Sequence, residues 1–208
     1  MPCRRHPRAA SHCGYCAVCL LEEALAPEVG GRQLTIQVPL GETPSASVFL
    51  VKDGGPAHRL LRLKTWRRPA AAGFLERFHR LQARLESWTV EGIIRPIAAG
   101  VDALGRPSVL TEFKQGVPIL DRVRSGRLDR EEAIARLTPL ITLIESAHTR
   151  GLFHGSIAPG NVIVGSDSPR VRLLDFGLAP LMSSAEDYAA LSSADIAGFA
   201  ALTRTLRL

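Results

Sequence analysis

The feature that most constrains this 208-residue chain is a β-hairpin pattern with a short polar motif on each side. The mainly apolar stretches 162–164 and 171–174 flank a Ser/Asp/Pro turn, which predicts two antiparallel strands. The motif before the hairpin is His154-Gly155-Ser156-Ile157-Ala158-Pro159-Gly160-Asn161, and the motif that ends it is Leu174-Asp175-Phe176-Gly177. Asp-Phe-Gly alone is weak evidence for a functional motif, because an ordinary turn after a buried strand can contain these three residues. Whether the two motifs have a function must therefore be judged from the rest of the chain.

Strand patterns dominate the first part of the chain, and helical patterns dominate the last part. Apolar alternation predicts a strand, a turn and a strand over residues 33–51, then strands at 61–64, 93–101 and 108–113. An amphipathic helix is predicted over residues 74–85 and a last helix over residues 194–206. The apolar face of the first of these helices consists of Phe74, Phe78, Leu81 and Leu85. This order of elements predicts an α+β fold with two lobes.

A longer helix is predicted between Asp129 and Gly151. Asp129 is its expected N-cap, with Glu132 three positions on as in a capping box, and Gly151 is expected to end it. Pro139 lies inside the pattern and should kink or split the helix. The predicted apolar stripe consists of Ile134, Leu137, Ile141, Ile144 and Ala147.

The two motifs around the hairpin resemble the catalytic loop and the metal-binding triplet of protein kinases. The preceding residues 147–154 are also similar to the helix that leads into that loop. The resemblance implies that Asn161 and Asp175 are the Mg²⁺ ligands, since Mg²⁺ is a hard ion that takes oxygen donors and bridges the phosphates of ATP. It also implies that His154 supports the loop, whereas His148 is expected to pack or to face solvent.

The strand-rich part of the chain matches the kinase pattern in part. Residues 40–48 occupy the place of the glycine-rich loop, but only Gly41 and Val48 match its pattern. Thr43 and Ala46 replace glycines there. Lys64 ends a strand at the position of the lysine that pairs with the nucleotide phosphates. We therefore expect Gly41, Val48 and Lys64 to face a bound nucleotide.

Two further pieces extend the resemblance from residue 33 to about residue 206. Residues 110–116 are similar to the hinge between the kinase lobes, with Thr111 at the gatekeeper position and Glu112 as a nucleotide-binding residue. Asp195 resembles the aspartate that opens the helix buttressing the catalytic loop. Because these pieces follow one another in the family's order, the resemblance implies a protein-kinase-like fold.

Departures from the kinase pattern shape the predicted function. Ser156 stands where the catalytic aspartate accepts the proton of the substrate hydroxyl, and serine cannot act as a base near neutral pH. A positioned base contributes about 10²–10⁴ in rate. Ala158 replaces the lysine that neutralises the transferring phosphate, and Arg62 replaces a small alanine beside the adenine. These changes favour a catalytically impaired kinase that either binds ATP and Mg²⁺ weakly or binds no nucleotide and acts as a regulatory scaffold.

The helices also depart from the family pattern. Glu76 is the only acid between residues 74 and 85, and it is out of register with the glutamate that pairs with the strand lysine. No Ala-Pro-Glu motif lies between Gly177 and Asp195. The sequence stops within the buttressing helix, which predicts a truncated helical lobe. We expect Phe199 and Leu202 to be poorly covered there.

All four cysteines lie within the first nineteen residues, which favours metal over disulfide in a cytosolic chain. Cys3 and His6 form one short ligand pair, and Cys16 and Cys19 form another, as in a closed tetrahedral zinc site. Cys13 is an alternative fourth ligand. The run resembles small B-box-like zinc fingers, which implies a structural Zn²⁺ knuckle; the alternative is a tip with free thiols.

The predicted domains are a zinc knuckle at residues 1–25, a linker at 26–32, a β-rich kinase N-lobe at 33–113 and a helical, truncated C-lobe at 114–208. Net charge is +6, and residues 54–84 contain eight basic residues and one acid. We interpret this stretch as a solvated face plus one functional lysine, although it could attract an acidic partner. The absence of an apolar leader or spanning segment predicts a cytoplasmic protein without membrane contact.

Three functions follow from these observations. The first is an impaired kinase-like regulator that the zinc knuckle brings to a protein partner. The second is an active serine/threonine-type kinase, supported by Lys64, Asn161 and Asp175. The third is a zinc-dependent adaptor for protein or nucleic acid; Glu22 and Glu23 beside the knuckle make nucleic-acid contact unfavourable there.

Overall fold

The computed structural model describes residues 11–12, 15–16, 28–165, 170–183 and 187–207. These residues form a mixed α+β protein with an antiparallel sheet, an architecture compatible with a kinase-like fold. The chain divides into two compact units. One runs to Pro69 and adds Ala98–Phe113, and the other comprises Ala70–Ile97 and the residues from Lys114 onward. The segment 70–97, predicted within the β-rich lobe, thus groups with the helices.

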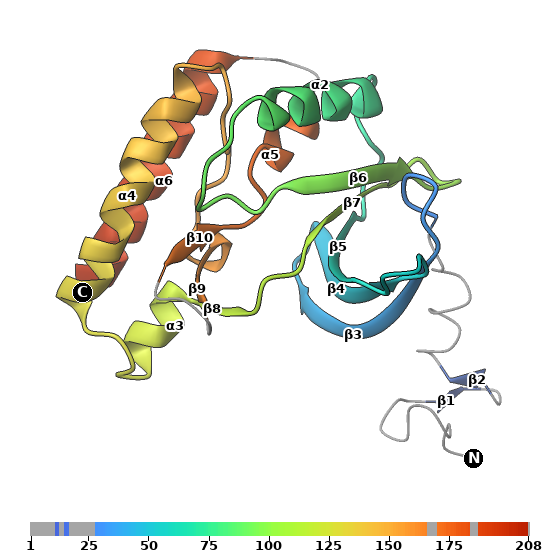
Figure 1. Ribbon diagram of the computed structural model, residues 1–208, viewed down its shortest axis with the longest axis horizontal. Helices are drawn as coiled ribbons and strands as arrows, with labels where there is room; N and C mark the ends of the chain where they lie inside the picture. The colour runs from blue at the N-terminus through green and yellow to red at the C-terminus, as the bar shows by residue number, and fades with distance from the viewer. Residues whose placement is uncertain (1–10, 13–14, 17–27, 166–169, 184–186, 208) are drawn as a thin grey trace. The chain divides into compact units, whose positions relative to one another are not determined.

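The first unit is built on five strands, ordered β3-β4-β5-β7-β6 (Figure 1). The pairs β3–β4, β4–β5 and β5–β7 are antiparallel. Leu61, Leu63, Val109 and Leu110 are buried at its centre, as the sequence pattern predicts. The strands are β3 (Leu34–Glu42), β4 (Ala46–Asp53), β5 (Leu60–Trp66), β6 (Pro96–Val101) and β7 (Pro107–Glu112).

The N-terminal end of the chain is described only in part. β1 (Ser11–His12) and β2 (Tyr15–Cys16) pair antiparallel. Of the predicted zinc ligands, Cys3, His6, Cys13 and Cys19 lie outside the described residues, so the zinc knuckle stays a prediction. Residues 29–32, predicted within a linker, form a tight turn in which Val29 is buried.

The second unit contains the helices α2 to α6 and a small three-stranded sheet. Helix α2 (Phe74–Glu86) buries Phe74, Phe78, Leu81 and Leu85, the face that its apolar spacing predicts. Strands β9 (Val162–Gly165) and β10 (Val171–Leu173) form the predicted hairpin, with Val171 opposite Val164. Strand β8 (Gly116–Pro118), which sequence patterning missed, pairs with β9. The unit also contains two short helices, α3 (Ile119–Arg124) and α5 (Leu178–Leu181).

Helix α4 (Arg130–His148) confirms its predicted N-cap and corrects its predicted stripe. The Asp129 carboxylate accepts the Glu132 backbone N–H at 2.7 Å. Pro139 does not split the helix, which runs through it. The expected Ile141 is 42% exposed, because Leu140 instead faces the neighbouring elements. The buried residues are Ala133, Leu137, Leu140, Ile144 and Ala147.

Helix α6 (Tyr188–Arg207) packs against α4 and begins six residues before its predicted start (Figure 1). The expectation that Leu202 is poorly covered is wrong: Leu202 and Leu206 are both fully buried. Phe199 is partly buried. Among the helices that the structure describes, none combines the length and the apolar character that crossing a membrane requires.

Candidate functional site

The loop 154–161 is fastened to helix α6 by one buried carboxylate. Asp195 is fully buried and accepts the backbone N–H groups of His154 at 2.9 Å and Gly155 at 2.7 Å. Its Oδ2 also lies 3.0 Å from Nε2 of His148, at the end of α4. A buried carboxylate is tolerated only when such donors satisfy it. These bonds hold the loop to α6, as the position of Asp195 implies. His148, expected to pack or to face solvent, packs against Phe153 with ring centroids 5.0 Å apart and in addition joins this network.

His154 ties the same loop to the end of the hairpin. The backbone N–H of Ser156 donates to Nδ1 of His154 at 3.1 Å. Because Nδ1 is an acceptor, Nε2 carries the proton of the neutral ring and donates to the Leu174 carbonyl at 2.8 Å. The ring is completely buried and meets Phe176 edge-on, with centroids 5.9 Å apart. His154 therefore positions the residue that immediately precedes Asp175.

Asn161 is oriented by the backbone of Ser156. It ends a single 3₁₀ turn, η1 (Pro159–Asn161), and its Nδ2 donates to the Ser156 carbonyl at 2.9 Å. This bond assigns the amide so that Oδ1 is the end left to accept from, or to ligate, another group. The Asn161 carbonyl accepts the Leu174 N–H at 2.8 Å. The structure thus brings Ser156, Asn161 and the start of the Asp-Phe-Gly triplet together.

Asp175 has an unusual backbone conformation. Its φ is 59°, and only one other non-glycine residue in the described part of the chain, His58, has a positive φ. Aspartate tolerates this left-handed region better than most residues, but the conformation still costs energy. Asp175 is 5% exposed, and its carbonyl accepts the Leu178 N–H at 3.1 Å. Such held strain is a mark of functional positions.

The side chain of Ser156 does not provide a base, although its backbone is fully engaged. Its N–H donates to His154 and its carbonyl accepts from Asn161. The residue is exposed, and it stands where the kinase resemblance predicts the catalytic aspartate. The backbone contacts of the loop are therefore present, and the side chain at this position carries a hydroxyl.

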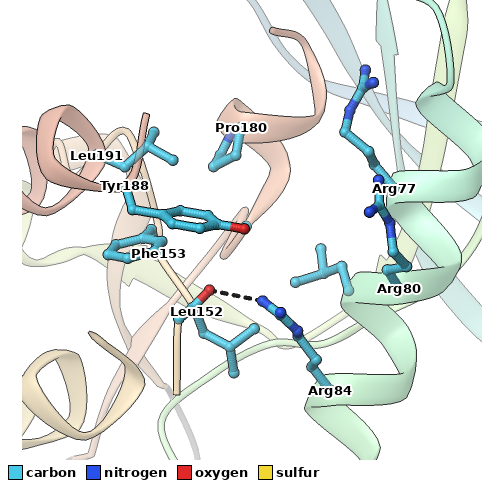
Figure 2. Close-up of a pocket in the computed structure, with 11 residues that line it drawn as sticks. Arg77, Arg80, Arg84, Leu152, Phe153, Pro180, Tyr188 and Leu191 are labelled. Atoms are coloured by element: carbon cyan, nitrogen blue, oxygen red, sulfur yellow. Dashed lines mark hydrogen bonds between the residues drawn. The ribbon is translucent and has the colours of Figure 1, made fainter. Parts of the chain in front are cut away.

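Two arginines of helix α2 donate hydrogen bonds to backbone carbonyls of this unit. Arg77 donates from Nη2 to the Leu181 carbonyl at 2.9 Å. Arg84 donates from Nη1 to the Gly151 carbonyl at 3.1 Å (Figure 2). With Arg80 they line a cavity of about 90 Å³. The sequence suggested a solvated basic face, so these docking contacts were missed. The i, i+7 spacing of Arg77 and Arg84 was the available signal.

The single acid of α2 lies on the helix surface. Glu76 is 3.9 Å from Arg80, one turn away, and both side chains are mostly exposed. A surface pair of this kind contributes little to stability. Glu76 therefore does not take the role of a buried helix glutamate within this unit.

In the first unit, three predicted nucleotide-binding residues lie in one line across the sheet. Gly41 on β3 is opposite Val48 on β4, which is opposite Lys64 on β5. Nζ of Lys64 is 5.0 Å from the centroid of Trp66. The turn before β4 is closed by Thr43, whose Oγ1 accepts the Ala46 N–H at 3.0 Å. The predicted glycine-rich loop is therefore a tight, side-chain-stabilised turn.

The predicted hinge residues lie at the end of β7. Glu112 is 3.7 Å from Arg59. Thr111 is 1% exposed and stands opposite Arg62 in the β5–β7 register. Its Oγ1 has no hydrogen-bond partner among the described residues. The predicted gatekeeper residue thus has a buried hydroxyl without a partner among the described residues, and it is paired with Arg62 on the neighbouring strand.

Asn161 and Asp175 offer the donor chemistry that Mg²⁺ prefers, an amide oxygen and a carboxylate. Within the described residues, no three His, Cys, Asp or Glu side chains gather closely enough to hold a metal ion by themselves. A magnesium ion bound mainly through nucleotide phosphates requires only one or two protein ligands. The two residues therefore fit an ion that arrives with its nucleotide.

Comparison with known proteins connects the chain to serine/threonine kinases, although no family model matches it. It is 26% identical over 155 residues to the probable serine/threonine-protein kinase PknB of Lactococcus lactis, covering 69% of this chain and 23% of that protein. It is 32% identical over 115 residues to the serine/threonine-protein kinase PknK of Mycobacterium tuberculosis, covering 54% and 10%. CBL-interacting protein kinase 10 of Oryza sativa is 32% identical over 72 residues, covering 35% and 16%.

The chain thus spans about a quarter or less of the length of these curated relatives. Their modest identity supports a protein-kinase-like superfamily for this chain.

Proposed function

We propose that this chain is a catalytically impaired protein-kinase-like domain that binds nucleotide and Mg²⁺ weakly and serves as a regulatory scaffold for a protein partner in the cytoplasm. The observation that carries the proposal is the contrast within loop 154–161. The hydrogen bonds of Asp195, His154 and Asn161 hold its backbone, but Ser156 stands at the position of the base.

The chemistry of Ser156 and Ala158 supports low phosphotransfer. A serine hydroxyl does not accept a proton near neutral pH, so the substrate hydroxyl would have to attack without a base. Loss of that base costs about 10²–10⁴ in rate. Ala158 has no charge with which to stabilise the phosphoryl group as it moves. Both losses act on the transition state and leave the fold intact.

Nucleotide binding is expected to be weak for a different reason. Asn161 and Asp175 suit a magnesium ion, and Lys64 suits a phosphate. The closed turn at Thr43 and the bulk of Arg62 work against the phosphates and the adenine, respectively. We therefore expect a Kd for the ATP–Mg²⁺ complex in the millimolar range.

Thermal melting with and without ATP and Mg²⁺ tests this binding. At a ligand concentration of about five times Kd, mass action stabilises the folded state by about 1 kcal/mol, which raises Tm by about 2–4 °C for a chain of this size. Asp175→Asn is the matched variant, because asparagine tolerates the positive φ while the carboxylate charge is lost. A shift that survives in Asp175→Asn, or no shift at all, would contradict nucleotide binding at this site.

Phosphotransfer from radiolabelled ATP to a generic basic protein tests the impairment. The double variant Ser156→Asp, Ala158→Lys restores both missing groups on a loop whose backbone is already held. We expect it to raise the rate by about 10²-fold or more over the natural sequence. A natural sequence that already transfers phosphate at typical kinase rates of about 1–100 s⁻¹ would refute the proposal.

Such a result would favour the alternative, an active serine/threonine-type kinase. The observation in its favour is the retention of Lys64, Asn161 and Asp175, because positioning and electrostatics supply most of the catalysis of phosphoryl transfer. The zinc-dependent adaptor has no comparable support among the described residues.

A further inference from the structure

Three arginines of helix α2 line the cavity of about 90 Å³ in the helical unit (Figure 2). Arg77, Arg80 and Arg84 are spaced i, i+3 and i+7, so they lie on one face of the helix. The facing wall includes Phe153, whose ring stacks on Tyr188 with centroids 5.4 Å apart. None of the described residues that line the cavity is acidic. Neither the kinase resemblance nor the comparisons assign a role to it.

Two of these arginines have only neutral partners in the part of the chain that the structure describes. Arg77 donates to the carbonyls of Ala72 and Leu181, and Arg84 donates to the carbonyl of Gly151. A carbonyl oxygen orients a guanidinium group but does not neutralise its charge. Neither arginine forms an ion pair with a described carboxylate. Two positive charges at the cavity wall are therefore left without a described counter-charge.

Arg77 also has a donor that its neighbours do not satisfy. Its Nε is buried and has no hydrogen-bond partner among the described residues. Native proteins seldom leave a buried N–H group without an acceptor, because its lost hydration is not replaced. Arg80 does not enter this argument, since its guanidinium lies 3.9 Å from the carboxylate of Glu76. Charge and hydrogen bonding thus both indicate that an acceptor is needed beside Arg77.

The size of the cavity limits what this acceptor can be. A volume of about 90 Å³ is several times the roughly 10–15 Å³ that one water molecule requires, so an ion of a few heavy atoms fits. Sites for larger ligands begin at about 300 Å³, so the cavity is too small for a nucleotide. Figure 2 shows the Tyr188 hydroxyl pointing across this space toward α2.

We propose that this cavity binds one free oxyanion of the phosphate class, held by the guanidinium groups of Arg77 and Arg84. A guanidinium group presents five N–H donors in a planar fork that matches phosphate oxygens. Each arginine can therefore keep its carbonyl contacts and still donate to the ion. A dianion would also balance both positive charges. The proposal does not depend on nucleotide binding.

A bound ion would strengthen the attachment of α2 to the segment that follows the Asp-Phe-Gly triplet. A Cβ at Gly177 would lie 2.8 Å from Leu81 of α2, so the two segments already pack closely. Arg77 and Arg84 carry like charges on one face of α2, and an ion between them removes their repulsion. Phosphate would thus regulate how firmly the segment two residues beyond Asp175 is held.

Titration of the full chain with sodium phosphate, followed by the arginine Nε–H signals in nuclear magnetic resonance spectra, tests the proposal. Sodium chloride keeps the ionic strength constant, and Mg²⁺ and nucleotide are left out. We expect saturable 1:1 binding with a Kd on the order of 1 mM. At ten times Kd, Tm should rise by about 3–6 °C for a chain of this size.

Phosphate also stabilises many proteins because it is excluded from their surface, and that effect requires no bound ion. The shape of the titration separates the two. Signals of Arg77 and Arg84 that shift and reach a plateau support the proposal. Signals that do not shift, or that drift in proportion to concentration without a plateau, would overturn it.

Matched variants locate the site. Arg84→Met keeps the apolar stem but removes the charge, and it should weaken phosphate binding about tenfold or more. Arg84→Lys retains the charge and should lose less affinity than the methionine variant. Arg124→Met makes the same change at an exposed residue of α3 outside the lining and should leave Kd unchanged. Circular dichroism confirms that each variant is folded. An unchanged Kd in Arg84→Met, or an equal loss in Arg124→Met, would contradict the proposal.

One further variant separates this site from the predicted magnesium site. Asp175→Asn should bind phosphate with the Kd of the natural sequence, so a failure of nucleotide binding leaves this test unaffected. Loss of phosphate binding in Asp175→Asn, together with normal binding in Arg84→Met, would place the ion beside Asp175 and refute the assignment to the arginine-lined cavity.

Discussion

Asp195→Asn should destabilise the protein far more than a surface change of the same kind. The substitution keeps the shape of the side chain but removes its charge and turns one oxygen into a donor. In the native protein Oδ2 accepts from His154 and lies 3.0 Å from Nε2 of His148, while Oδ1 accepts from Gly155. Because the side chain is fully buried, water cannot replace a lost partner.

The magnitude follows from the better of the two amide orientations. Asparagine loses least when its oxygen replaces Oδ2, which keeps two contacts without charge assistance. Its NH₂ group then faces the Gly155 N–H, so one charge-assisted bond is lost and two donors oppose each other. A bond to a charged group is worth about 1.5–3 kcal/mol, and the lower cost of burying a neutral amide offsets part of the loss. We expect a net loss of about 2–4 kcal/mol.

Urea unfolding followed by far-ultraviolet circular dichroism measures this loss, and the midpoint of thermal unfolding should fall by about 4–16 °C. Asp187→Asn is the control, because Asp187 is an exposed residue whose Oδ1 accepts the Ala190 N–H at the start of α6. Asparagine caps a helix about as well as aspartate, so this control should change stability by less than about 0.5 kcal/mol. If both variants are equally mild, Asp195 does not anchor the loop and the reasoning fails.

Three other substitutions test separate features. Gly177→Ala should lower the free energy of unfolding by about 2 kcal/mol or more, because the φ of Gly177 is 75° and the new Cβ would lie 2.8 Å from Leu81. Gly160→Ala is the control: a Cβ at Gly160 meets no atom within 4 Å, so the melting temperature should hardly change. Pro139→Ala should raise the free energy of unfolding by about 1–2 kcal/mol. An interior proline destabilises a helix by about 3 kcal/mol, and about 1 kcal/mol of this is offset because proline lowers the conformational entropy of the unfolded chain. An unchanged melting temperature would mean that α4 accommodates the proline without destabilisation. The pKa of Asp53 is held below its usual value by the Gly55 N–H and then by Arg32, so its contribution to stability is present above the unfolded pKa of about 3.9 and is lost as pH falls through the lower folded pKa. The stability difference between the natural sequence and Asp53→Asn should therefore shrink below about pH 4 in acid titrations, and a difference independent of pH would contradict this assignment.

Sequence patterns correctly predicted the elements whose structure depends mainly on residues close together in the chain. The face of α2, the hairpin β9–β10 and the Asp129 cap each depend on neighbours within a few residues, so periodicity and capping rules sufficed. The buried face of α4 was predicted wrongly at Ile141. Leu140 and Ile141 are adjacent and both apolar, so only the packing of the neighbouring elements decides that Leu140 is the buried one. The start of α6 at Tyr188 was missed because polar serines and alanines carry little periodic signal.

The candidate site divides in the same way. The motif order singled out Asn161, Asp175 and Asp195. The contacts of Asp195 with the loop fit the position assigned to it, and the magnesium-binding roles of Asn161 and Asp175 stay predictions. His148 and the docking arginines Arg77 and Arg84 were missed, because their partners are backbone carbonyls or a carboxylate far away in the sequence. Surface charge and docking charge look alike in a sequence; only the acceptors distinguish them.

The bonds from Asp195 also set an order of assembly. They join residues 40, 41 and 47 positions apart, so the loop is completed only after the whole hairpin and the first turns of α6 have been synthesised and have docked. Until then the His154 and Gly155 amides remain open to exchange with solvent deuterium. Their protection therefore reports that α6 has docked on this loop.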